Sequence, residues 1–127
     1  MPLTQISMRK GKSEEFRRAI MDGIYSAMRS GFAVPEDDRF MTISEFGDAD
    51  FSYGYRYPNV DRSDDLIIIK ITVSNNRSRE QKLALYKAVN HELEERAGVR
   101  PDDIFINIVE VLPENWSFGR GRAQNIE

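Results

Sequence analysis

The stretch DLIIIKITVSNNRS, residues 65–78, decides the fold. Its first nine residues carry apolar side chains on both faces of an extended chain, which predicts a β-strand in the centre of a sheet. The polar turn SNNRS follows at residues 74–78. Ser78 and Gln81 then form a Ser-x-x-Gln capping box, which predicts that a helix starts there. The segment therefore predicts a central strand that leads through a polar turn into a helix.

The helix after this turn is indicated by apolar residues that recur with helical spacing, and Gly98 is placed to end it. The sequence DIFINIVEV at residues 103–111 predicts a further strand. A strand, a helix and a second strand in succession form a right-handed βαβ unit, whose two strands are parallel. The apolar positions of the helix are Ala84, Leu85, Ala88, Val89 and Leu93.

The first part of the chain repeats this pattern. Aligning residues 3–46 with residues 68–111, an offset of 65, gives ten identities and brings the helix caps, the apolar stripes and the strand starts into register. We infer an internal duplication with pseudo-repeats at residues 2–46 and 67–111; the alternative is a chance similarity of two ordinary βαβ units. In the first repeat, Gly31 is predicted to form the C-terminal cap of the helix.

The two units predict a single α/β domain over residues 1–127, with a C-terminal tail at residues 112–127. The expected fold is a four-stranded mixed sheet with two helices on one face. The linker, residues 47–64, is predicted to hold a short strand or hairpin around FSYGYRY. Because residues 65–73 are apolar on both faces and two helices cover only one face, we expect the open face to be buried in an oligomer.

Composition excludes several classes of function. The chain has no cysteine and one histidine, His91, which excludes disulfides, thiolate chemistry and a multi-histidine metal site. A net charge of −3 gives no broad basic surface for nucleic acid. The apolar runs are too short to span a membrane, and no signal peptide is indicated. We therefore expect a cytoplasmic protein that binds neither nucleic acid nor membranes.

Pro2 is open to two interpretations. A proline commonly starts a strand because it has no backbone N–H to donate. Alternatively, removal of Met1 makes Pro2 the terminus, with a free secondary amine that can act as an acid or a base. Parallel pairing of the strands in the first βαβ unit places Asp38 at the same end of the sheet, and antiparallel pairing of the two units adds Arg77. Asp38 as a turn residue and Arg77 as a solvated charge are the simpler alternatives.

In these features the sequence resembles the tautomerase superfamily, and within it the malonate semialdehyde decarboxylase group. The resemblance extends over nearly the whole chain, and WSFGRGRA is its most specific motif. The segments that carry it are Pro2, VPEDDRF (34–40), RSREQK (77–82), RPDD (100–103) and WSFGRGRA (116–123).

The resemblance implies a homotrimer with sites near the subunit boundaries and no cofactor. It implies that Pro2 is the catalytic amine and that Asp38 binds or activates water. Arg77 would bind a substrate carboxylate, and Trp116 and Phe118 would wall the pocket. The implied activity is that of a small lyase, hydratase or isomerase on oxo acids or unsaturated acids, by decarboxylation, hydration or keto–enol tautomerisation. The alternative is a catalytically idle trimer that binds a small carboxylate or a protein.

The sequence departs from the decarboxylase pattern at one position. That pattern has two arginines, spaced Arg-x-Arg, before the second helix, whereas here Asn75 stands in the first place and only Arg77 remains. We expect Asn75 and Arg77 together to form a weaker clamp for the substrate carboxylate. Loss of one positive neighbour, with Asp38 retained, also favours a cationic Pro2 at neutral pH. Hydratase or decarboxylase activity is then expected to exceed tautomerase activity.

Overall fold

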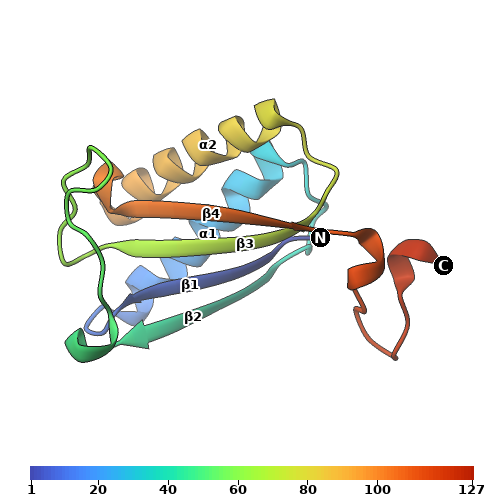
Figure 1. Ribbon diagram of the computed structural model, residues 1–127, viewed down its shortest axis with the longest axis horizontal. Helices are drawn as coiled ribbons and strands as arrows, with labels where there is room; N and C mark the ends of the chain where they lie inside the picture. Colours follow the sequence, from blue (N-terminus) through green and yellow to red (C-terminus); the bar gives the residue numbers. More distant parts are fainter.

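The computed structural model describes residues 1–127 as two layers, a four-stranded sheet and a pair of helices on one of its faces (Figure 1). The strands lie in the order β2-β1-β3-β4, so the stretch singled out above does provide a central strand. The predicted fold class is confirmed. The elements are β1 (Leu3–Arg9), α1 (Glu14–Gly31), β2 (Phe40–Phe46), β3 (Ile67–Ser74), α2 (Arg79–Ala97) and β4 (Ile104–Val111).

Strand register repeats along the chain at the predicted offset. β1 is parallel to β2, β3 is parallel to β4, and β1 and β3 are antiparallel at the centre. Leu3 lies opposite Phe40, and Ile68 lies opposite Phe105, so each partner is displaced by 65 residues. The antiparallel pairing of β1 with β3 therefore relates the two βαβ units by an approximate twofold axis.

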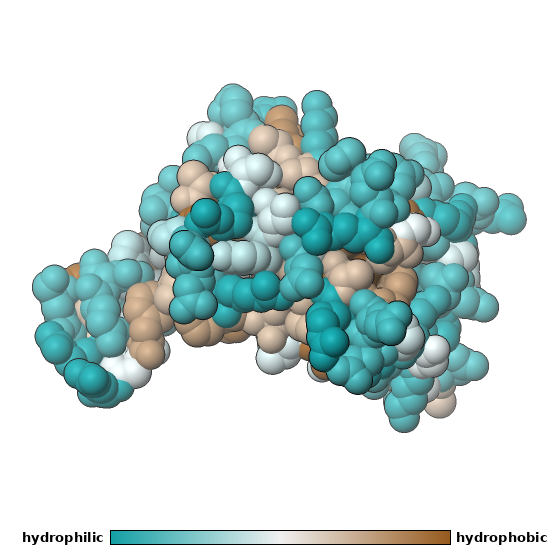
Figure 2. Space-filling model, turned by 180° about the vertical axis from the view of Figure 1, so that it is seen from behind, coloured by the Kyte–Doolittle hydropathy of each residue, from teal (hydrophilic) through white to brown (hydrophobic).

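The two faces of the sheet differ in polarity. Ile6, Ile69 and Ile71 point toward the helices and are buried. Figure 2 shows the molecule from the side on which the helices lie, where hydrophilic residues cover much of the surface. On the open face of the sheet, Lys70 is exposed beside the half-buried Thr72. The expectation that β3 is apolar on both faces was therefore wrong, because both of its internal polar residues fall on the open side.

Gly31 does not cap α1, contrary to the prediction. It is the last helical residue, the cap is Phe32 in a right-handed conformation, and the left-handed residue after it is Ala33. Gly31 instead allows the two helices to approach, since a Cβ atom placed on it would lie 3.1 Å from the Cα atom of Leu85. Gly98 does cap α2 in a left-handed conformation, as predicted.

The linker contains no strand or hairpin, which corrects the prediction for FSYGYRY. It forms a short 3₁₀ turn at Asp48–Asp50 and then crosses the end of the sheet that lies away from the N-terminus (Figure 1). Arg9, at the end of β1, holds it by donating hydrogen bonds to the Asp48 carboxylate at 2.7 Å and to the Tyr53 hydroxyl at 3.0 Å. These side-chain bonds replace the backbone pairing of a hairpin.

Replacement of Gly31 by alanine is expected to destabilise the protein by about 1–3 kcal/mol, because the added methyl group meets backbone atoms of α2 that cannot move aside. Gly23→Ala is the matched control in the same helix. Its Cβ atom would lie 3.0 Å from the Leu93 Cδ2 atom and 3.3 Å from the Arg96 Cδ atom, which belong to side chains and not to the backbone, and alanine gains about 1 kcal/mol of helix propensity. Urea unfolding midpoints measure both changes. Equal midpoints for the two variants would contradict the close helix contact.

Candidate active site

The chain begins beside a carboxylate. Pro2 is buried at the start of β1, and the amino nitrogen of Met1 lies 3.8 Å from the Asp38 Oδ2 atom. Asp38 precedes β2, and the parallel pairing of Leu3 with Phe40 brings it to the start of β1. The predicted meeting of the N-terminal end of β1 with Asp38 is therefore present in the fold.

Asp38 has an unused acceptor. Its side chain is only 10 % exposed, and its Oδ1 atom is buried without a hydrogen-bond partner. The backbone N–H of Asp38 donates to the Pro35 carbonyl at 3.2 Å, which fixes the turn before β2. A buried carboxylate oxygen without a donor carries a free-energy cost, which a bound donor would remove. Asp38 therefore carries a buried acceptor that no group of the chain satisfies.

Arg77 approaches the same region from the turn after β3. One of its guanidinium nitrogens donates to the Asn76 Oδ1 atom at 2.7 Å, and the guanidinium carbon lies 4.9 Å from the centre of the Phe32 ring. Unlike Arg9 and Arg39, it forms no ion pair with a carboxylate. Stacking on Phe32 orients the guanidinium group and leaves its charge free to bind an anion.

Burial and charge act on the terminal amine in opposite directions. Burial lowers the pKa of the Met1 amino group from its ordinary value of 8.0, and this is the largest effect. The negative charge of Asp38 raises this pKa, and the positive charge of Arg77 lowers it. The net direction is downward, so the site favours a neutral amine.

Two cavities meet at Met1. One, of about 520 Å³, is polar and contains Asp38 and Arg77; the other, of about 440 Å³, is largely apolar and contains Pro2. Met1 and Phe118 line both cavities, so the two cavities adjoin at these residues. The remaining residues of the polar cavity are Phe32, Pro35, Asn76, Gln81 and Asn125, and those of the apolar cavity are Leu3, Phe40, Asn115, Trp116 and Ser117.

Trp116 and Phe118 form an aromatic wall at the apolar cavity. Their rings are stacked with centres 5.7 Å apart. The indole N–H of Trp116 donates to the Ser74 Oγ atom at 3.0 Å, which ties the C-terminal tail to the end of β3. Both residues line the apolar cavity.

Asn75 lies outside both cavities. It is exposed, and its backbone N–H donates to the Val111 carbonyl at 3.0 Å, as in a continuing strand ladder. Its neighbour Asn76 lines the polar cavity instead, together with Gln81 and Asn125, and sequence reasoning missed all three as site residues. Gln81 had a signal only as a capping residue, a role it does fill by accepting from the Ser78 N–H at 2.8 Å.

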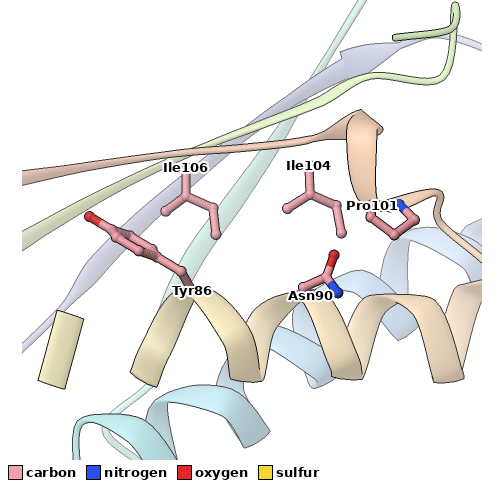
Figure 3. Close-up of a pocket in the computed structure, with 5 residues that line it drawn as sticks. All are labelled: Tyr86, Asn90, Pro101, Ile104 and Ile106. Carbon is pink, nitrogen blue, oxygen red and sulfur yellow. The ribbon is translucent and has the colours of Figure 1, made fainter. Parts of the chain in front are cut away.

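A further cavity of about 280 Å³ lies between α2 and β4 (Figure 3). Its lining is formed by Tyr86, Asn90, Pro101, Ile104 and Ile106, none of which is charged at neutral pH. It offers neither a free cation nor a carboxylate. No group of three His, Cys, Asp or Glu side chains could hold a metal ion, and no helix is long and apolar enough to cross a membrane.

The chain is similar in sequence to two proteins that are described as probable tautomerases. The chain is 40% identical to a probable tautomerase, YusQ, of Bacillus subtilis (strain 168) over 127 residues, which is the full length of both. It is 27% identical to a second probable tautomerase of that strain, YrdN, covering 98% of this chain and 95% of the relative.

Solved structures of similar proteins agree with these two relatives. A crystal structure of malonate semialdehyde decarboxylase matches with a TM-score of 0.92 at 30% identity, over 98% of this chain and 95% of that one. The FG41 malonate semialdehyde decarboxylase inhibited by 3-bromopropiolate gives 0.91 at 32% identity, over 98% and 94%. A fused 4-OT symmetric trimer shares the fold, with a TM-score of 0.80 at 16% identity over 98% of each chain. The family model described as a tautomerase enzyme matches residues 38–119, and the chain belongs to that family.

Proposed function

We propose that the chain, after removal of Met1, is an enzyme whose Pro2 amine transfers a proton to or from a small oxo acid. One observation carries the proposal: Met1, whose amino nitrogen lies 3.8 Å from the Asp38 carboxylate, lines a cavity together with Asp38 and with Arg77, whose guanidinium forms no ion pair. An amine, a carboxylate and a free cation together suit proton transfer on an anionic substrate.

Arg77 binds the substrate carboxylate in this proposal, and Asp38 accepts a hydrogen bond from water or from a substrate hydroxyl. The aromatic wall of Trp116 and Phe118 excludes water from the amine. Asn75 has no part in the site of a single chain, because it lines neither cavity.

Keto–enol tautomerisation is the reaction that the electrostatics favour. A base must be neutral to accept a proton. Burial lowers the pKa of the Met1 amino group, and we expect it to act in the same direction on the Pro2 amine once Met1 is removed. The charges alone had favoured a cationic Pro2, but burial acts against a cation. Decarboxylation or hydration is the second candidate, because two decarboxylase structures match at 30% and 32% identity over nearly the whole chain.

We also propose that three copies assemble around the open face of the sheet. Leu3, Phe40 and Phe105 are exposed on that face, and a structural relative is described as a trimer. A catalytically idle trimer that binds a carboxylate or a protein is the alternative, and the activity measurements below distinguish it.

Sedimentation equilibrium is expected to give three times the chain mass of 14.7 kDa. A monomer at micromolar concentration would contradict the assembly.

Pro2→Ala is expected to lower kcat/KM for enol substrates by about 100-fold or more, the usual contribution of general acid–base catalysis. Pro113→Ala, at an exposed proline in the tail, is the matched control and should keep full activity. Intact-mass analysis must accompany both measurements, because a retained Met1 would leave the Pro2 nitrogen in an amide. Full activity in Pro2→Ala would show that the secondary amine of proline is not required, because the variant keeps a primary terminal amine.

Arg77→Ala is expected to lower kcat/KM for carboxylate substrates by about 10- to 150-fold, which corresponds to a lost charge-assisted hydrogen bond of about 1.5–3 kcal/mol. Arg79→Ala removes an exposed arginine two residues away that forms no ion pair, and should have little effect. Because the Arg77 charge lowers the pKa of the amine, its removal should also move the pH–rate profile of a base-catalysed reaction upward. A profile that moves downward would refute this electrostatic coupling.

A further inference from the structure

The end of the sheet opposite the candidate active site carries its pseudosymmetric counterpart. At the offset of 65, Asp38 corresponds to Asp103 and Arg77 corresponds to Lys12. The backbone geometry repeats as well. The Asp103 N–H donates to the Arg100 carbonyl at 2.9 Å, just as the Asp38 N–H donates to the Pro35 carbonyl at 3.2 Å. A cavity of about 110 Å³ contains Lys12 and Asp103.

The segment that follows the second strand of each βαβ unit also repeats. The 3₁₀ turn Asp48–Asp50 of the linker corresponds to Pro113–Asn115 of the tail. The rings of Phe51 and Tyr53 lie 5.1 Å apart, and those of their counterparts Trp116 and Phe118 lie 5.7 Å apart. The correspondence therefore extends beyond the βαβ units into the segments that follow β2 and β4.

The counterpart site differs because the linker occupies it. The Asp65 carboxylate lies 2.7 Å from the Lys12 Nζ atom. The backbone N–H and the hydroxyl of Ser63 donate to the two Asp103 carboxylate oxygens at 2.7 and 2.6 Å. Lys12 thus holds a carboxylate where Arg77 is unpaired, and Asp103 accepts a hydroxyl where the Asp38 Oδ1 atom has no donor.

The apolar half of the counterpart is covered in the same way. The Arg62 guanidinium lies over the Phe105 ring, 5.7 Å from its centre, and Phe105 corresponds to Phe40 of the apolar cavity. Arg100 adds a second cation to the counterpart, 3.3 Å from Asp103 and donating to the Asp61 carbonyl. The linker residues Asp61–Asp65 therefore contact the residues that correspond to Asp38, Phe40 and Arg77 of the candidate active site.

We propose that Ser63 and Asp65 are an internal ligand of a second anion-binding site, formed by Lys12 and Asp103. The ligand class of this site is a carboxylate with a neighbouring hydroxyl, and the chain itself supplies both groups. Lys12 is 30 % exposed and Asp65 is 62 % exposed, so solvent reaches the ion pair. An external carboxylate therefore binds at Lys12 once the Asp65 carboxylate is removed. This inference depends on the geometry of the chain and not on the proposed activity.

The test is acetate binding to Asp65→Ala, followed through the amide NMR signals of Gly98 and Val99, which line the counterpart cavity. Acetate should shift these signals saturably with a millimolar dissociation constant and raise the unfolding midpoint of the variant, at an ionic strength held constant with chloride. The unchanged protein should show neither effect, because its own carboxylate occupies Lys12. Asp64→Ala, which removes the adjacent exposed carboxylate, is the matched control and should respond like the unchanged protein.

Two further variants make the result decisive. Lys12→Gln combined with Asp65→Ala should abolish the acetate response. Asp65→Ser, whose side chain is too short to reach the Lys12 Nζ atom, replaces Asp65→Ala if the alanine variant is unfolded. Equal acetate shifts in all these proteins, or none in either Asp65 variant, would overturn the proposal.

Discussion

The antiparallel pairing of β1 with β3 is the contact on which the rest of the structure depends. Ile6 lies opposite Ile69 at its centre, and both side chains are buried against the helices. The pairing also turns β3 so that Thr72, near its end, lies opposite Leu3 at the start of β1. The turn that carries Arg77 therefore arrives at the N-terminus, where the α1 crossover independently delivers Asp38.

The same pairing builds two similar ends, and chain continuity makes them different. At one end, the amino nitrogen of Met1 lies 3.8 Å from the Asp38 Oδ2 atom. At the other end, Leu66 and Ile67 stand in the places of Met1 and Pro2 and are buried as ordinary core residues. The segment before them must cross that end of the sheet to connect the two units. A duplicated fold joined by a linker thus has one open site and one site filled by its own connection.

The main features of the fold and of the site could be predicted from the sequence because they follow from local signals and topology. Hydrophobic periodicity predicted the strands and helices, the parallel crossover placed Asp38 near Pro2, and the antiparallel pairing of the two units placed Arg77 there. Asn76 and Asn125 could not be found in this way, because their approach to the cavity depends on side-chain direction and on the path of the tail. Gly31 was misjudged for a similar reason, since its contact with Leu85 exists only between packed helices.

The protonation of the amine shows most clearly why charge counting is insufficient. Residue types reveal that Asp38 raises the pKa of a nearby amine and that Arg77 lowers it. They do not reveal how far the amine is removed from water, and here that removal is the largest influence. The unpartnered Oδ1 atom of Asp38 also bears on the pKa of the amine. A hydrogen-bond donor bound to this atom would offset part of the negative charge that otherwise raises this pKa. A neutral ligand that donates to Asp38 should therefore push the amine further toward its neutral form, whereas the negative charge of a bound carboxylate would shift it toward the cation.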